Sequence, residues 1–301
     1  MIEQQEIIFS FEKNLNNDKA TYSKLIELYH ILNALDQKKI ILDFSNITFL
    51  SANLLAILGC CVDSTMTKRN HKIALRNLHP EIKAVMQKNG FNRYFTWNNL
   101  DDQYHNIMNY DIFKSTTEHL VDFERYLLLN VFSRNNLPVM NSAYKNSIID
   151  NFLEMFNNVI DHANSSYVYV CGQFFPKSKN LCFSIVDIGK TIAENVTSYL
   201  RAASLSVPGN TLEWAIIPGN STKALEAPGG LGFSTLLDFL KHNNGSFILI
   251  SDKELYELQA GKERFDILTQ PFPGAIVTIT INLKDEQWYF FDKNNHDLII
   301  F

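Results

Sequence analysis

Apolar residues in the first hundred positions form short continuous runs that alternate with stretches of helical spacing. Leu25, Ile26, Tyr29, Leu32 and Leu35 recur on one face of such a helix. The expected elements, alternately strand and helix, are Glu6–Phe11, Ala20–Leu35, Lys39–Phe44, Ala52–Thr67, His71–Leu75 and Pro80–Asn89. Strands that alternate with helices indicate βαβ units and therefore a parallel sheet.

The pattern changes after residue 116, where two amphipathic helices precede the strands. The expected helices are Glu118–Ser133, Ser142–Ala163 and Gly232–Asn243, and the expected strands are Tyr167–Gln173, Leu181–Asp187, Ser246–Ser251 and Ala275–Leu283. Between them, Gly189–Pro228 shows no sustained period and is expected to be a long irregular stretch. Helices followed by mainly antiparallel strands favour a two-layer α+β sandwich.

A polar stretch at residues 98–116, NNLDDQYHNIMNYDIFKST, separates the two patterns. It is rich in Asn and Asp and has no clear period, which is typical of a connection. The chain has 301 residues, enough for two domains. We therefore expect an α/β domain at 1–97, a linker at 98–116 and an α+β domain at 117–301, each with its own core.

Composition narrows the expected partners and compartment. The net charge is −5 and no basic tract occurs, which argues against nucleic-acid binding. No apolar run approaches the roughly 18 residues of a membrane span, and the opening MIEQQEIIFSFEKN is too polar for a secretory signal. The four cysteines lack Cys-x-x-Cys or zinc spacing, so we expect buried, reduced thiols in a cytoplasmic protein: Cys60, Cys61, Cys171 and Cys182.

Three segments of the second half carry candidate chemistry. In NFLEMFNNVIDHA, residues 151–163, the side chains of Glu154, Asn158 and His162 are four residues apart and share a ridge opposite the apolar face. The solvated face of an ordinary amphipathic helix would look similar. In LCFSIVDIGKTI, residues 181–192, an apolar strand runs into Asp187, although Asp-x-Gly after a strand is also a common turn.

The third segment is APGGLGFSTLLDFL, residues 227–240, which is rich in glycine and then helical. Free backbone N–H groups and the positive end of a helix dipole could hold phosphates there. A lone Gly-x-Gly is weak evidence. Here it follows the other two segments in order and at a workable distance.

In this order the three segments resemble the GHKL superfamily of ATP-binding domains, which includes gyrase, histidine kinases and anti-sigma serine kinases. Residues 151–163 match its N-box, Glu-x-x-x-Asn-x-x-x-His-Ala, at every defining position. The resemblance implies that Asn158 binds Mg²⁺ through its side-chain oxygen and that Glu154 orients or deprotonates the attacking water or hydroxyl. It places His162 near the ribose or phosphates, although a His at a helix C-terminus is equally favoured by the dipole.

The second segment resembles the pattern Asp-x-Gly-x-Gly-Ile. The resemblance implies that Asp187 accepts a hydrogen bond from the adenine amino group and that Gly189 lets the backbone approach the base, with Ile192 in the third matched place. Thr191 replaces the second Gly. Ala275 also departs from the family, which commonly has a Thr there that supports the adenine-binding Asp.

The third segment resembles the second glycine box, Gly-x-Gly-Leu-Gly, with Pro228 at the first Gly place. Its matched positions are Gly230, Leu231 and Gly232. The stretch Lys190–Ala227 corresponds to the ATP lid of the family. Within it, PGNSTK holds side chains that either reach the terminal phosphates or belong to a solvated loop: Ser221, Thr222 and Lys223.

Residues 5–97 resemble a STAS domain of the anti-sigma-factor-antagonist type, through KIILDFSNITFLSANLLAILGCC and LHPEIKAVMQKNGFNRYF. In that family a loop of Asp-Ser-Ser-Gly character carries the phosphorylated Ser. Here Ala52 takes the phosphoacceptor place and Ser51 the Asp place, so that chemistry is absent at the matched position. Ser51 is either a shifted acceptor or, as we favour, the N-cap of the following helix.

The combined expectation is an Mg-ATP-binding signalling or regulatory protein. One hypothesis is a catalyst, either a slow ATPase or a serine kinase for a partner STAS-like protein, and Glu154 favours it. The other is an ATP-gated binding switch or scaffold without phosphotransfer, which the altered Thr191 and Ala275 favour. Besides a STAS-like or regulatory protein, a second copy of the chain is a candidate partner, because GHKL relatives often dimerise.

Overall fold

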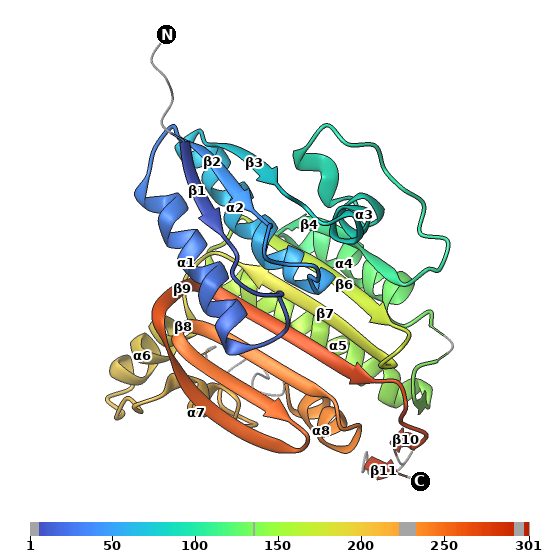
Figure 1. The fold of residues 1–301 in the computed structure, drawn as a ribbon. Coiled ribbons are helices and arrows are strands. Elements are labelled where there is room, and N and C mark those ends of the chain that lie inside the picture. The colour runs from blue at the N-terminus through green and yellow to red at the C-terminus, as the bar shows by residue number, and fades with distance from the viewer. Residues whose placement is uncertain (1–5, 135, 223–232, 292–297, 301) are drawn as a thin grey trace.

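Three parallel strands open the chain and are joined by two helices (Figure 1). The computed structural model describes residues 6–134, 136–222, 233–291 and 298–300. The first elements are β1 (Glu6–Ser10), α1 (Lys19–Ala34), β2 (Lys39–Asp43), α2 (Leu55–Arg69) and β3 (Lys72–Arg76). Both strand pairs are parallel, with Ile8 opposite Ile41 in the first. The βαβ arrangement expected from the alternating pattern is confirmed.

A larger antiparallel sheet follows, with strand order β4-β6-β7-β9-β8. Its strands are β4 (Ile107–Lys114), β6 (Tyr167–Phe175), β7 (Asn180–Asp187), β8 (Ser246–Gln259) and β9 (Lys262–Asn282). The expected linker at 98–116 is therefore wrong in part, because β4 lies inside it and forms one edge of this sheet. The last two expected strands, Ser246–Ser251 and Ala275–Leu283, are longer in the structure, because β8 and β9 extend beyond them into a long hairpin.

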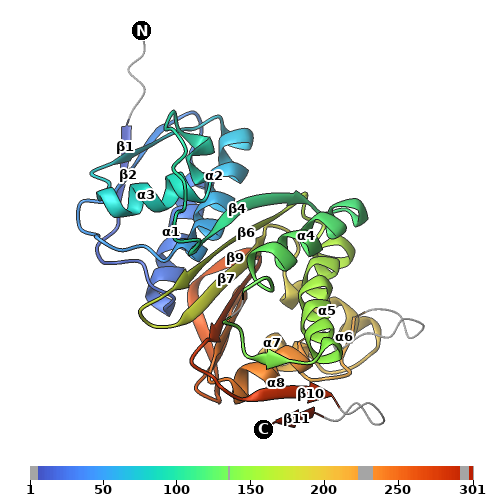
Figure 2. The same ribbon diagram turned by 90° about the vertical axis from the view of Figure 1, so that its right-hand side faces the viewer.

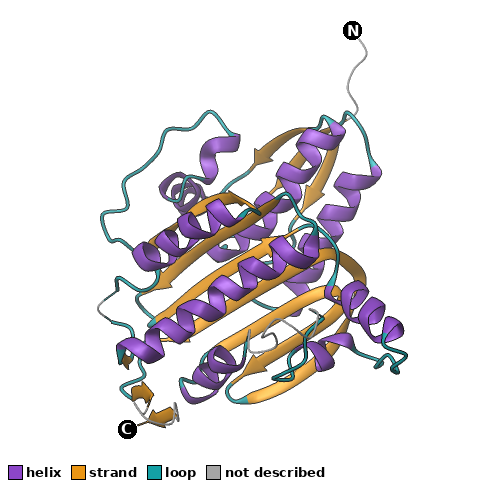
Figure 3. Ribbon diagram, turned by 180° about the vertical axis from the view of Figure 1, so that it is seen from behind, coloured by secondary structure: helices purple, strands orange, loops and turns teal. Residues whose placement is uncertain are grey.

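Helices cover one face of the large sheet, here called the front face (Figure 3). They are α4 (Thr117–Asn130), α5 (Ser142–Asn158) and α8 (Ser234–His242). The stretch expected to be irregular, Gly189–Pro228, instead contains α6 (Ile192–Ala202) and α7 (Thr211–Ala215). Short elements complete the described chain: the helix α3 (Pro80–Lys88), the 3₁₀ turns η1 (Ala52–Leu54) and η2 (Phe91–Tyr94), and a small sheet of β5 (Val139–Met140), β10 (Trp288–Phe291) and β11 (Leu298–Ile300).

The rear face of the large sheet packs against α1 and α2 (Figure 2). Alternate residues of β6 separate the two cores, because successive side chains of a strand point to opposite faces. Val168 and Val170 belong to the front core with α4 and α5, whereas Tyr169 and Cys171 belong to the rear core with α1 and α2. The first hundred residues thus share a core with the large sheet instead of burying one alone.

Polar contacts fasten this rear layer to the sheet. His30 of α1 lies 2.6 Å from the Pro271 carbonyl oxygen of β9, and the Tyr169 hydroxyl donates to the Asp63 carboxylate of α2 at 2.7 Å. Asn53 of η1 donates to the Ser184 hydroxyl of β7 at 2.9 Å. The rear layer therefore contacts the same strands that carry front-face chemistry.

Ser51 occupies the N-cap position of η1 without capping it through its side chain. Its hydroxyl donates instead to the side-chain oxygen of Asn53 at 2.6 Å, and the residue is only 3% exposed. The expected side-chain cap is therefore wrong, because burial against the sheet gives the hydroxyl another partner. All four cysteines are buried free thiols, as expected. Within the described residues, no helix is long and apolar enough to cross a membrane.

Candidate functional site

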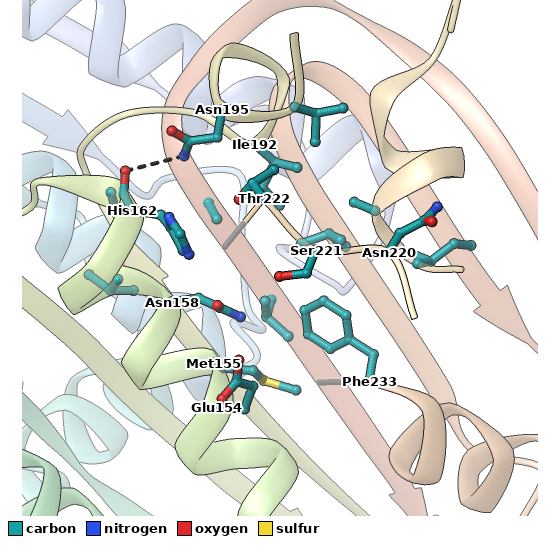
Figure 4. Close-up of a pocket in the computed structure, with 18 of the residues that line it drawn as sticks. Glu154, Met155, Asn158, His162, Ile192, Asn195, Asn220, Ser221, Thr222 and Phe233 are labelled. Atoms are coloured by element: carbon teal, nitrogen blue, oxygen red, sulfur yellow. Dashed lines mark hydrogen bonds between the residues drawn. The ribbon is translucent and has the colours of Figure 1, made fainter. Parts of the chain in front are cut away.

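A pocket opens on the front face where α5, α6, α7 and the start of α8 surround strands β7, β8 and β9 (Figure 4). Its floor is formed by apolar side chains of the sheet: Ile185, Leu249, Ala275 and Val277. Polar side chains come from the surrounding helices. This combination of an apolar floor with a few polar groups is the usual form of a small-molecule site.

The ridge of α5 faces this pocket. Glu154, Asn158 and His162 all line it, so the structure brings together the three side chains that their spacing placed on one face (Figure 4). The helix does not continue regularly to Ala163 as expected. Residues 159–163 form a π-helical turn that ends at Asn164 in the left-handed conformation, φ 51°. Such turns are rare and often lie at functional sites.

The π turn also ties α5 to α6. The side-chain amide of Asn195 donates to the backbone oxygen of His162 at 3.2 Å (Figure 4). Asn195 lines the pocket and was not among the predicted site residues. Its contribution depends on a contact between segments 33 residues apart, which no local pattern reveals.

Asp187 ends strand β7 and lies in the pocket floor, 3% exposed. Its Oδ2 atom is buried and has no hydrogen-bond partner among the described residues. Burial raises the pKa of this carboxyl to about 7, while a backbone hydrogen bond from Ala275 acts in the opposite direction. An orphan acceptor in an apolar floor is unusual, because buried polar atoms normally have partners.

Two glycines allow close packing of backbone behind Asp187. A β-carbon on Gly189 would clash with the carbonyl oxygen of Ala163, and one on Gly274 would clash with the carbonyl oxygen of Asp187. Gly274 also has φ 113°, which favours glycine. The requirement for Gly189 thus comes from the end of the π turn. Gly189 does not itself line the pocket, and its expected approach to a base stays a prediction.

Thr191, which stands where the GHKL pattern has its second glycine, is the N-cap of α6, a role that the comparison with the pattern did not predict. Its hydroxyl accepts from the Glu194 N–H, and the Glu194 carboxylate accepts from the Thr191 N–H at 2.7 Å, which together form a capping box. The pattern Thr-x-x-Glu signals a helix start in the sequence itself. The helix α6 then directs Ile192 into the pocket, as expected, and the Ile192 N–H donates to Ser251 at 2.9 Å.

Helix α7 and the residues after it form the opposite wall. Trp214 and Ile216 line the pocket, and the Asn220 side chain donates to the Trp214 backbone oxygen at 2.8 Å. Ser221 and Thr222 line it as well, whereas their expected contact with the terminal phosphates stays a prediction. Lys223, together with the glycine-box residues Gly230, Leu231 and Gly232, lies outside the described residues. The wall is therefore helical in part, where an irregular stretch was expected.

The N-terminus of α8 closes the pocket next to Asn158. Phe233 and Ser234 line it, and the Leu236 N–H donates to the side-chain oxygen of Asn151 on α5 at 2.8 Å. The N-cap residue itself, Phe233, provides no side-chain cap. The dipole of this helix favours an anion near its start.

Within the described ranges, no group of three or more His, Cys, Asp or Glu side chains could hold a metal ion. A closed, all-protein metal centre of the zinc type is therefore not formed by these residues. Magnesium keeps most of its waters and shares a ligand's phosphates, so one or two protein oxygens suffice to hold it. Asn158 offers such an oxygen beside Glu154.

Comparison with known proteins does not assign the chain. No model of a protein family matches it. A search of curated proteins likewise finds no significant match. The functional assignment therefore rests on the site itself.

Proposed function

We propose that this pocket binds Mg-ATP and that residues 107–301, which begin with β4, act as a GHKL-like ATP-binding domain. The observation that carries the proposal is Asp187, a buried carboxylate with an orphan oxygen in an apolar floor. Leaving such an atom unpaired costs about 1–3 kcal/mol, so a ligand that supplies a donor there gains affinity. The amino group of adenine is a donor of this kind, and a flat apolar floor suits its ring.

The polar ridge of α5 supports the triphosphate end of the same proposal. Asn158 would hold Mg²⁺, which neutralises phosphate charge, and the start of α8 would face phosphate oxygens. Glu154, one turn before Asn158, would take a proton from the attacking water or from a serine hydroxyl. The adenine would thus be recognised at the floor of the pocket, and the phosphates at the ridge of α5 and the start of α8.

The proposed activity is slow ATP hydrolysis or serine phosphorylation of a separate STAS-like protein. The STAS-like half of this chain is a poor substrate for its own site. Ala52 has no hydroxyl, and Ser51 is buried against the rear of the sheet, whereas the pocket opens on the front. A kinase of this design therefore needs a partner that brings an exposed serine.

A second candidate is an ATP-gated switch without phosphotransfer. The observation that favours it is the wall of α6 and α7, which adds pocket residues from outside the sheet and is held by side-chain hydrogen bonds such as that between Asn220 and Trp214. A nucleotide that contacts this wall would change a surface available to a partner or a second copy.

Incubation with γ-labelled ATP separates these candidates. Released phosphate indicates hydrolysis, label on an added STAS-like protein indicates a kinase, and neither result together with measured binding indicates the switch. Binding itself is followed by the fluorescence of Trp214, which lines the pocket, with Trp214→Phe as the control for the two remote tryptophans Trp97 and Trp288. No binding at millimolar Mg-ATP would overturn the proposal.

A further inference from the structure

Glu254 on β8 is a buried carboxylate outside the predicted site. It is 8% exposed and forms no ion pair with a described residue. Burying an unpaired carboxylate is costly unless hydrogen bonds replace its water. The partners of Glu254 therefore indicate why the sequence keeps a carboxylate there.

Among the described residues, every hydrogen bond of this carboxylate goes to the start of α7. The Thr211 N–H lies 2.9 Å from both Oε1 and Oε2, the Thr211 hydroxyl donates to Oε2 at 2.7 Å, and the Leu212 N–H donates to Oε2 at 3.0 Å. Asn210 caps the same turn with its side-chain oxygen, which accepts from Leu212 at 3.0 Å. A charged acceptor makes these bonds stronger than neutral ones.

An irregularity in β8 directs Glu254 to this position. Asp252 has φ 54°, and the register against β9 shifts on both sides of it. Leu249 and Ser251 face the front before this point, and Tyr256 faces the front core after it. The alternation is thus displaced by one residue, so Glu254 points forward to α7 instead of back to the rear layer.

The helix held by Glu254 forms one wall of the pocket. Trp214 and Ile216 lie three and five residues after Thr211, and the Asn220 side chain bonds to the Trp214 backbone. Trp214 also packs against Tyr199 of α6, with ring centroids 5.9 Å apart. A five-residue helix is too short to be stable alone, so its position depends on such contacts.

We propose that Glu254 is a positioning residue: its carboxylate holds α7 on the sheet and thereby sets how fast the bound ligand leaves the pocket. The inference rests on the proposed function for the identity of the ligand, Mg-ATP, but not for the anchoring itself. Loss of the anchor leaves the floor at Asp187 and the ridge at Asn158 in place. It should therefore act on ligand release more than on adenine recognition.

The test compares Glu254→Gln with Glu257→Gln in the full chain. Gln keeps the size but turns an N–H group toward the donors of Thr211 and loses the charge. Glu257 is on the same strand and pairs with Arg264 at 2.7 Å, remote from α7, so it controls for the substitution. A milder variant, Thr211→Val, removes only the hydroxyl donor and keeps the test valid if Glu254→Gln folds poorly.

Two readouts are needed. Hydrogen exchange of the Thr211 and Leu212 amides should be roughly 10- to 100-fold faster in Glu254→Gln, as expected for loss of bonds to a charged acceptor. Stopped-flow release of a fluorescent ATP analogue should accelerate about tenfold, while Glu257→Gln matches the unaltered protein in both. Unchanged amide exchange in Glu254→Gln would contradict the proposal that Glu254 anchors α7. Faster exchange with unchanged release would overturn its control of the pocket.

The two proposals fail separately. If the unaltered protein binds no ATP analogue, the proposed function is wrong, and the exchange measurement still decides whether Glu254 anchors α7. If the analogue binds but neither Glu254→Gln nor Thr211→Val alters exchange or release, only the inference about Glu254 is wrong.

Discussion

Asp187 and Ala275 lie directly opposite each other on strands β7 and β9, and the Ala275 backbone donates a hydrogen bond to the Asp187 carboxylate. The second carboxylate oxygen has no hydrogen-bond partner among the residues that the structure describes. A threonine at position 275, as the GHKL pattern has, would offer a hydroxyl on the same face of the sheet. Among the described residues the Ala275 backbone alone supports the carboxylate, and burial keeps the pKa of Asp187 high.

The raised pKa of Asp187 makes the stability of the fold depend on pH. With a folded pKa of about 7 against an ordinary 3.8, the native state favours the protonated acid. The contribution of this group to the free energy of unfolding is therefore greatest below about pH 4 and is lost as pH rises through 7. At pH 8, Asp187→Asn should stabilise the ligand-free protein by as much as about 4 kcal/mol, since one pKa unit corresponds to about 1.4 kcal/mol.

Urea unfolding at pH 8 and pH 4 measures this difference. The stabilisation should shrink toward zero at pH 4, and the exposed Asp150→Asn on α5 should show neither effect. Destabilisation by Asp187→Asn at pH 8 would mean that the carboxylate has a partner that stabilises its charged form.

Asn158→Ala should abolish Mg-dependent ATP binding while the protein stays folded. The side chain lines the pocket and points away from the front core, so its removal leaves packing intact. Asn157→Ala is the matched control, because Asn157 is adjacent on α5 and does not line the pocket. Calorimetric titration with Mg-ATP decides, and an affinity equal to that of the control would remove Asn158 from the site.

Glu154→Gln should retain ATP and lose turnover. The amide keeps the shape of the side chain but cannot accept a proton, and loss of a general base typically lowers a rate by about 10²–10⁴-fold. Phosphate release by a coupled assay, alongside equilibrium binding, measures both quantities. Turnover at the unaltered rate would make Glu154 structural and shift the account to the switch.

Deletion of residues 1–97 should leave a protein that aggregates. The rear layer covers large apolar side chains of the sheet, among them Tyr169, Val186, Ile248, Ile250 and Ile276. Burial of each contributes about 1.5–3 kcal/mol, against a total stability of about 5–15 kcal/mol for a domain. Residues 98–301 expressed alone should be insoluble and should become soluble when residues 1–97 are co-expressed. If residues 98–301 alone formed a soluble monomer that binds ATP, the two halves of the chain would be independent domains after all.

Local patterns predicted the early elements well. The run KIILD became β2, and the helical spacing of Leu25, Ile26 and Leu32 became the buried face of α1. These signals need no distant partner. The sequence did not predict strand β4, because Asn109 and Asp111 have low strand propensity. Met108 and Tyr110, which alternate with them, are nevertheless fully buried.

The candidate site was predictable where its residues share one element. Glu154, Asn158 and His162 reach one pocket because they lie on one helix and the π turn after it. Asn195 and Trp214 depend on how α6 and α7 pack on the sheet, which is a tertiary property. Thr191 and Glu194 form a capping box, whose pattern is present in the sequence and predicts the start of a helix. This prediction was missed because the segment was expected to be a loop.

The most direct test of the account replaces a single group on the ligand. ATP and inosine triphosphate differ at the position of the adenine amino group, where inosine has an oxygen. Calorimetric titration of the full chain at pH 8 in the presence of Mg²⁺, where Asp187 is mainly ionised, should give ATP an affinity roughly 10- to 100-fold higher, as expected for one hydrogen bond to a charged group. Equal affinities, or no binding of ATP, would contradict the assignment of this pocket to an adenine nucleotide.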